Sequence, residues 1–103
     1  MGIYRGKLDI IADILNVASR NPKKTQIMYQ ANLSFRVLQK YLAELSSASL
    51  ICFENEPNRY TLTLKGKEFL DAYKLYSKTN RHAEKIIGEV NSKKRTLEKL
   101  VNQ

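Results

Sequence analysis

The sequence predicts a mainly α-helical fold with a small β-hairpin, in which a long C-terminal helix follows a compact N-terminal domain. Apolar residues recur at helical spacing before residue 50, strand-like runs flank a turn at 54–58, and residues 64–103 contain no proline. A chain of 103 residues holds one small domain, or one small domain plus an appendage. We therefore expect an N-terminal arm (1–7), a domain (8–63) and a long helix (64–103).

The N-terminal arm is short and basic and contains Arg5 and Lys7. The first helix is expected from about Leu8 to Ser19, because its apolar residues share one face. These residues are Leu8, Ile11, Ile14, Leu15 and Ala18. Pro22 follows shortly afterwards, and proline cannot continue a helix.

Two more helices are expected in close succession. The first runs from Lys23 to Ala31, and after a three-residue turn the second runs from Phe35 to Leu45, with Ser34 as a good N-cap. The polar residues at the N-terminus of the first are Lys23, Lys24 and Thr25. Free N–H groups and added cations at such a site favour a bound phosphate. Two short helices joined by a tight turn form a helix-turn-helix pattern.

The Phe35–Leu45 helix has two chemically different faces. Its apolar face consists of Leu38, Tyr41, Leu42 and Leu45. Its opposite face consists of Arg36, Gln39, Lys40 and Ala43. Such donor-rich side chains suit base edges and phosphates in the DNA major groove, although in a single helix the same face is also typical of simple solvation.

A β-hairpin is expected after this helix. Strands at Leu50–Phe53 and Arg59–Thr63 flank a turn that contains proline and asparagine. A helix-turn-helix followed directly by a hairpin is the order of elements in a winged helix, and the hairpin would be the wing. Cys52 lies in the apolar first strand, where we expect it to be buried.

The C-terminal segment has the pattern of a coiled coil. Its positions at alternating four- and three-residue spacing are Phe69, Tyr73, Tyr76, Asn80, Ala83, Ile87, Val90, Lys94, Leu97 and Val101. A helix of about 38 residues would be ~57 Å long, so the small domain cannot cover the whole seam and a second chain is needed. The alternative is a helix that frays after about Ser77.

A homodimer is therefore expected. The interface residues are Tyr73, Tyr76, Ala83, Ile87, Val90, Leu97 and Val101. A parallel pair would place Lys94 against Lys94 in the seam, whereas an antiparallel pair would let Lys94 lie along the tyrosines of the partner helix. The antiparallel arrangement is favoured for this reason.

The composition indicates a polyanionic partner and offers no cluster of residues for catalysis or metal binding. The chain has 18 Lys and Arg against 10 Asp and Glu and a formal net charge of +8, which attracts nucleic acid or anionic membrane surfaces. Cys52 is the only cysteine and His82 the only histidine, so the sequence offers no disulfide and no catalytic or metal cluster. We expect no enzyme activity, no metal, no cofactor and no small-molecule substrate. Without an apolar run near ~18 residues or a signal peptide, a soluble, cytoplasmic protein with no membrane contact is expected. If it binds DNA, it would be nucleoid-associated.

Two segments resemble a known archaeal family. Residues 24–42, KTQIMYQANLSFRVLQKYL, are similar to the second and third helices of the ten-kilodalton a-type DNA-binding proteins of the crenarchaeon Sulfolobus. Residues 58–70, NRYTLTLKGKEFL, resemble that family's second wing strand and the start of its long helix, although Tyr-x-Leu-Thr-x-x-Gly recurs across many winged-helix regulators. The resemblance covers about residues 5–100.

The resemblance implies a winged helix-turn-helix that dimerises through an antiparallel coiled coil and binds double-stranded DNA, as a chromatin-type protein or a transcriptional regulator. Helix 34–46 would enter the major groove, with Arg36, Gln39 and Lys40 near base edges. The residues expected to contact phosphates or the DNA backbone are Arg5, Lys7, Lys23, Lys24, Thr25, Ser34, Asn58 and Arg59.

The alternative is a coiled-coil interaction module whose winged helix docks another protein. Glu54 and Glu56 make the wing tip acidic, which favours this alternative and weakens a wing contact with phosphates. The net charge and the donor-rich helix face favour DNA. The salt dependence of binding to random duplex DNA distinguishes the two functions.

Overall fold

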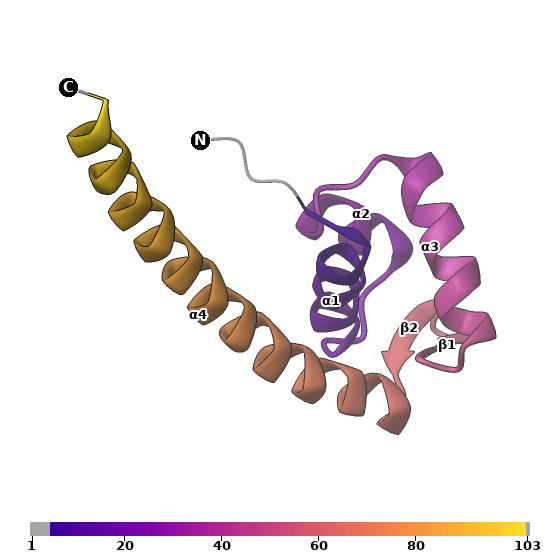
Figure 1. The fold of residues 1–103 in the computed structure, drawn as a ribbon. Helices are drawn as coiled ribbons and strands as arrows, with labels where there is room; N and C mark the ends of the chain where they lie inside the picture. The colour runs from indigo at the N-terminus through magenta and orange to yellow at the C-terminus, as the bar shows by residue number, and fades with distance from the viewer. Residues whose placement is uncertain (1–4, 103) are drawn as a thin grey trace. The chain divides into compact units, whose positions relative to one another are not determined.

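The computed structural model describes residues 5–102. Its elements in chain order are α1 (Lys7–Ala18), α2 (Lys24–Gln30), α3 (Phe35–Ser47), β1 (Ile51–Glu54), β2 (Arg59–Leu62) and α4 (Leu64–Val101) (Figure 1). The chain divides into two compact units between Tyr73 and Lys74. The predicted fold class, mainly helical with a winged helix and a long C-terminal helix, is confirmed.

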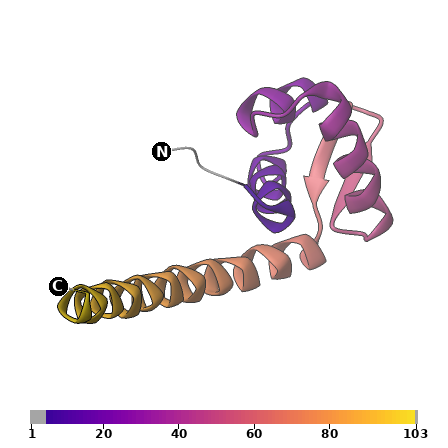
Figure 2. The ribbon, with the colours of Figure 1, turned by 45° about the horizontal axis from the view of Figure 1, so that its top comes forward.

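The first unit contains α1, α2, α3, the hairpin and the start of α4 (Figure 2). Its largest fully buried side chains are Ile14, Leu15, Ile27, Leu38 and Leu45. Ile27 comes from α2, and the other four come from the apolar faces predicted for α1 and α3, so burial of these side chains positions the three helices. Leu8 was predicted on the same apolar face, but it is not part of the core: it lies in the first turn of α1 and is 46% exposed.

The turn between α2 and α3 closes with a left-handed residue. Asn32 has a φ of 53°, and the Leu33 N–H donates to the Met28 carbonyl oxygen at 3.0 Å, which is the hydrogen bond of a Schellman motif. The Ser34 hydroxyl then accepts from the Val37 N–H at 3.2 Å and caps α3. The predicted tight turn and N-cap are both confirmed.

α3 is longer than predicted and ends at Ser47 instead of Leu45. Ser49, with a φ of 62°, terminates it, and the Leu50 N–H donates to the Leu45 carbonyl oxygen at 2.9 Å. Ser46 and Ser47 are thus helical, because this second Schellman-type turn ends the helix two residues after the predicted end at Leu45.

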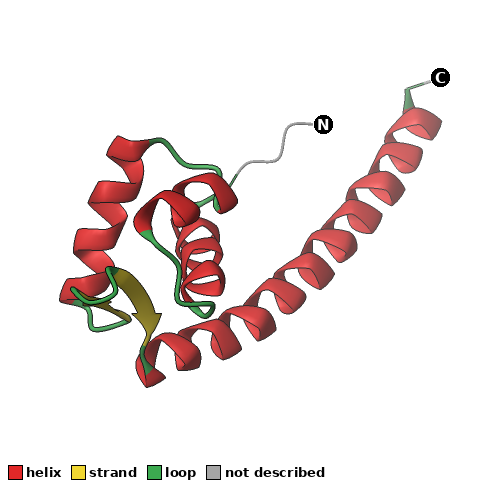
Figure 3. Ribbon diagram, turned by 180° about the vertical axis from the view of Figure 1, so that it is seen from behind, coloured by secondary structure: helices red, strands yellow, loops and turns green. Residues whose placement is uncertain are grey.

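The wing is a two-stranded antiparallel hairpin, with its strands in yellow in Figure 3. Its register pairs Ile51 with Leu62, Cys52 with Thr61 and Phe53 with Tyr60. Ile51 is buried against the helices, and successive strand residues point to opposite faces. The prediction that Cys52 is buried is therefore wrong: its side chain lies on the opposite face and is exposed.

The first turns of α4 pack against the winged helix. Leu70 is buried, and Phe69 and Tyr73 are half-buried against the core. A Cβ built on Gly66 would lie 2.3 Å from the Leu50 carbonyl oxygen, so only glycine allows this approach. The predicted boundary at 63/64 marks where α4 begins, whereas the compact unit continues to Tyr73.

The second unit consists of the rest of α4. The helix continues without interruption to Val101, so the alternative that it frays after Ser77 is wrong. Its side chains are almost all exposed in the single chain, including the apolar residues of the predicted seam. Among the described residues, no helix is both long enough and apolar enough to cross a membrane.

Candidate nucleic-acid interface

The outer face of α3 is fully available to a partner. Arg36, Gln39, Lys40 and Ala43 are all exposed. The opposite face is held in place because Leu38, Leu42 and Leu45 are buried in the core. The sequence-predicted division of this helix is confirmed, and the rigid helix presents three hydrogen-bond donors on one side.

Lys24 connects the start of α2 to α3. Its ammonium donates a hydrogen bond to the side-chain oxygen of Gln39 and lies 4.3 Å from the centre of the Phe35 ring. Because an ammonium group can only donate, the oxygen of Gln39 is the atom that faces Lys24. The amide nitrogen of Gln39 keeps its donors for another acceptor.

The start of α2, the outer face of α3 and the wing meet around two adjacent hollows. The larger hollow, of about 440 Å³, is lined by Lys23, Lys24, Thr25, Phe53, Asn58 and Tyr60. The smaller one, of about 220 Å³, is lined by Lys24, Gln39, Leu42, Ala43, Ser46 and Tyr60. Several predicted site residues from three elements therefore lie together on one surface.

Two aromatic residues at this surface were not predicted from the sequence. The Phe53 and Tyr60 rings lie 4.9 Å apart across the hairpin, because the register places them opposite each other. Burial raises the pKa of the Tyr60 phenol, so this hydroxyl stays protonated at neutral pH. The alternation of Tyr60 and Leu62 with two threonines in the second strand was the available signal, and the continuous apolar run before Phe53 gave none.

The predicted wing residues differ in their surroundings. Arg59 donates from Nη1 to the Asn21 carbonyl oxygen at 2.9 Å, which directs its guanidinium toward the loop after α1. Asn58 is exposed in the turn with a φ of 63°. Glu54 pairs with Arg59 in the hairpin register, so an acid sits opposite this base.

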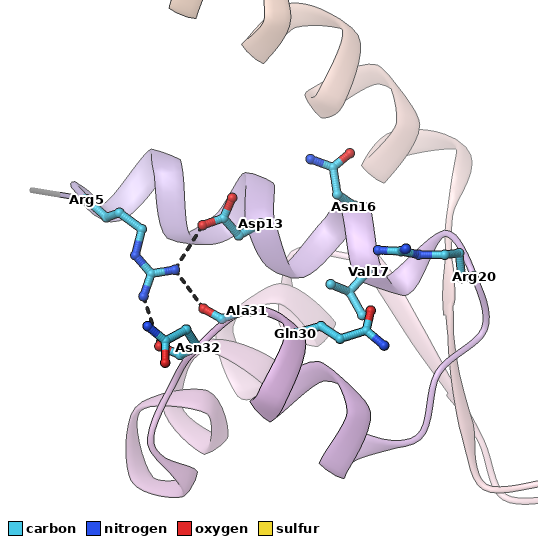
Figure 4. Close-up of a pocket in the computed structure, with 8 residues that line it drawn as sticks. All are labelled: Arg5, Asp13, Asn16, Val17, Arg20, Gln30, Ala31 and Asn32. Carbon is cyan, nitrogen blue, oxygen red and sulfur yellow. Dashed lines mark hydrogen bonds and ion pairs between the residues drawn. The ribbon is translucent and has the colours of Figure 1, made fainter. Parts of the chain in front are cut away.

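Arg5 makes contacts that the sequence analysis did not predict. Its guanidinium donates to Asp13 Oδ2 at 2.9 Å, to the Ala31 carbonyl oxygen at 2.7 Å and to the Asn32 carbonyl oxygen at 3.0 Å (Figure 4). These contacts fasten α1 to the C-terminal end of α2, where a cation is favoured. The predicted DNA contact of Arg5 stays a prediction, while the structure shows it in a scaffold role.

The remaining basic residues predicted in the arm and the helix-turn-helix are exposed. Lys7 begins α1 and forms an ion pair with Glu44 at 3.2 Å, in which both side chains are exposed. Such an exposed pair contributes little to stability, so Lys7 is free to exchange Glu44 for another anion. Lys23 and Thr25 are exposed at the start of α2.

Residues 4–81 match the family model described as winged helix-turn-helix. The chain belongs to the winged helix-turn-helix family. Its structure is similar to the crystal structure of Sso10a-2, a DNA-binding protein from Sulfolobus solfataricus, with a TM-score of 0.76 and 28% identity over 85% of this chain and 95% of that one. The predicted resemblance to the Sulfolobus family is thereby confirmed.

This winged helix-turn-helix protein also has a relative in another archaeon. It is 37% identical over 70 residues to an uncharacterised protein of Methanocaldococcus jannaschii. The match covers 67% of this chain and spans 32%, about a third, of that relative's length.

Proposed function

We propose that the protein binds double-stranded DNA and places the outer face of α3 in the major groove. The observation that carries this proposal is the exposed donor face of Arg36, Gln39 and Lys40 on a helix whose other side is buried. Arg, Gln and Lys donate to the acceptors that bases and phosphates present in that groove. The DNA-binding activity named for Sso10a-2 supports the same partner.

The residues around α3 would fix its position on the duplex. Lys23 and Thr25 line the larger hollow and Ser34 caps the start of α3, and their donors suit phosphate oxygens. The Ser34 oxygen accepts from Val37, which leaves its hydroxyl proton to donate. Asn58 would add a contact from the wing, while Arg59 is committed to the Asn21 carbonyl.

The protein would act as a homodimer through the second part of α4. Ile87, Val90 and Leu97 are 58%, 59% and 65% exposed in the single chain. Burying each such side chain is worth about 1.5–3 kcal/mol, so their alignment on one face favours self-association. The position of Lys94 in the seam favours antiparallel pairing, in which two like charges do not meet. Tyr73 contributes less than predicted, because its ring packs against Phe69 and its hydroxyl bonds to Asp9.

A test of DNA binding compares variants on the same random-sequence duplex. Arg36→Ala and Lys40→Ala should each weaken binding and reduce the slope of log K against log salt by about 0.9 for each lost phosphate contact. Arg20→Ala, which removes an exposed charge at the end of α1, is the control. If both α3 variants bind like this control, α3 does not face the DNA.

The role within the cell is a separate proposal. A chromatin-type protein would cover the genome broadly, whereas a transcriptional regulator would occupy a few sharp sites. Genome-wide occupancy distinguishes these roles. We propose no catalytic function.

Docking of a protein partner is the second candidate, and the wing favours it. Glu54 and Glu56 place two acids at the wing, and Phe53 beside them is 45% exposed. An acidic surface with an exposed aromatic suits a basic peptide better than a phosphate backbone. In that case, neutralising Arg36 and Lys40 would leave binding of the protein partner unaffected, and Glu54→Gln would weaken binding of that partner.

A further inference from the structure

The second unit carries a basic stripe on the side of α4 away from the apolar seam. We define the stripe as Lys74, Lys78, Arg81, Lys85, Arg95 and Lys99. With about 100° per residue, these positions fall within an arc of roughly 100°, centred roughly 160° from the seam. The uncharged positions of the same arc are Ser77, Gly88, Ser92 and Thr96. The glutamates at 84, 89 and 98 lie outside it, so no acid interrupts the stripe.

The basic side chains of the stripe are available to a partner. All six are exposed on a continuous helix. Within residues 5–102, the ion pairs join Arg5 to Asp13 and Lys7 to Glu44, and neither involves the stripe. Stripe cations four residues apart, such as Lys74 and Lys78, repel one another. Glu84, Glu89 and Glu98 lie three or four residues from stripe cations and offset only part of this repulsion. A polyanion would relieve this repulsion.

The dimensions of the stripe match a duplex. From Lys74 to Lys99 the helix rises by ~37 Å, close to the ~34–36 Å of one turn of B-DNA. Neighbouring stripe residues are three or four positions apart, or ~4.5–6 Å along the axis, except for the ten positions, or ~15 Å, between Lys85 and Arg95. A straight helix lying along a duplex meets the phosphate backbone where the strands wind past it, so cations at the two ends of the stripe can contact phosphates about one turn apart.

We propose that the basic stripe of α4 is a second DNA-binding surface, which contacts phosphates along a duplex without reading bases. The inference rests on duplex DNA being the partner of the winged helix, but it concerns a separate unit and separate residues. It gives each chain two binding surfaces. It also gives the charge of residues 74–103 a function beyond solubility.

An anionic membrane is the other polyanion that a basic, amphipathic helix could meet. The apolar side of α4 follows the four-three spacing of a helix-pairing seam. Once a partner helix covers that seam, the stripe itself offers charge and contains no apolar side chain to insert into lipid, while Leu75, Ile86 and Leu100 lie between the stripe and the seam. A polyphosphate backbone is the surface that such a stripe fits.

The test compares three double variants of the full-length protein, using fluorescence anisotropy on a 30-base-pair random duplex at several salt concentrations. The stripe variant is Lys78→Gln with Lys85→Gln, and the matched control is Arg20→Gln with Lys93→Gln, which removes the same charge outside the stripe. The third is Arg36→Gln with Lys40→Gln. Glutamine keeps helix propensity, and sedimentation checks that assembly is unchanged.

The stripe variant should lose about 1.8 from the salt slope per chain, and the matched control should keep the wild-type slope. Equal slopes for these two variants would overturn the proposal, as would tighter binding of the wild-type protein to phosphatidylserine vesicles than to the duplex at the same salt. Failure of the α3 proposal looks different. In that case the α3 variant keeps the wild-type salt slope, while the slope of the stripe variant still falls by about 1.8.

Discussion

The ammonium of Lys24 donates a hydrogen bond to the side-chain oxygen of Gln39, across the turn of the helix-turn-helix. A glutamine normally pairs with adenine through both its oxygen and its nitrogen. With Lys24 on one of the two lone pairs of its oxygen, Gln39 presents its N–H donors more readily than its acceptor, and N–H donors suit the O6 and N7 acceptors of guanine. We therefore expect a preference for guanine over adenine at the base pair that faces Gln39.

Lys24→Met tests this expectation, because it removes the donor and releases the Gln39 oxygen. Duplexes selected from a randomised pool should shift from guanine toward adenine at one position, by a discrimination of about 1–3 kcal/mol. Gln39→Ala is the control and should abolish the preference in either background. An unchanged preference for guanine in Lys24→Met would show that Lys24 does not orient Gln39.

Gly66→Ala should destabilise the winged unit. The added Cβ would lie 2.3 Å from the Leu50 carbonyl oxygen and 2.5 Å from Leu62 Cδ1, so the start of α4 must move. Overpacking of this kind costs about 1–3 kcal/mol. The matched control is Gly88→Ala, which meets nothing within 4 Å and should stabilise the helix by about 0.5–1 kcal/mol. Urea unfolding at one protein concentration measures both, and a Gly66→Ala midpoint at or above that of wild type would contradict the packing.

Tyr73→Phe should make stability depend less on pH at the acid end. The Tyr73 hydroxyl and the Gly6 N–H donate to Asp9 and lower its pKa below 3.8. A lowered carboxyl pKa contributes stability that is fully present above the unfolded-state value and is lost as the pH falls through the folded-state value. The variant should thus be less stable than wild type at pH 7.

The difference between Tyr73→Phe and wild type should shrink as the pH falls below the unfolded-state pKa of Asp9 and through its lowered folded-state pKa. Tyr29→Phe is the control, because that ring is 77% exposed on α2. Thermal unfolding between pH 2 and pH 7 measures the effect. A constant difference across this range would mean that the Asp9–Tyr73 hydrogen bond does not lower the pKa of Asp9.

Ile87→Asp should convert the protein to a monomer and weaken its apparent DNA binding, since two tethered sites gain avidity that one site lacks. Ser92→Asp adds the same charge on the opposite side of α4 and should leave assembly unchanged. Sedimentation at micromolar concentration measures the state. A monomeric wild-type protein under these conditions would exclude the dimer.

The direction in which the two α4 helices pair can be tested with a single thiol near the C-terminus of each chain. Because Cys52 is exposed, Val101→Cys must be made in a Cys52→Ser background. Antiparallel helices place the two introduced thiols at opposite ends of the coiled coil, so no disulfide should form between them. Ready cross-linking would show that the helices run parallel.

The helices and the hairpin could be predicted from the sequence because their signals are local. The apolar faces of α1 and α3, the cap at Ser34 and the turn at 54–58 each depend on residues within a few positions. The end of α3 was missed because a left-handed Ser49 is not a typical stop signal, unlike glycine. The exposure of Cys52 depends on which face of the hairpin the helices cover, and hydropathy alone does not report that.

The candidate site was predictable in its residue types but not in its contacts. Arg36 and Lys40 stood out because, at helical spacing, they fall on the face opposite the apolar residues. The hydrogen bonds of Arg5 to the end of α2 span 26 and 27 residues, so they depend on tertiary packing. The same holds for Lys24 and Gln39, which are 15 residues apart.

Groove entry by α3 is the central claim, and a titration of the ¹⁵N-labelled protein with a short duplex tests it most directly. The amide signals of α3 around Arg36, Gln39 and Lys40, and those at the start of α2 around Lys24, should shift or broaden first. Signals of the core residues Ile14 and Leu15 should stay unchanged. Shifts confined to the wing or to α4, with α3 unaffected at saturating duplex, would contradict the placement of α3 in the major groove.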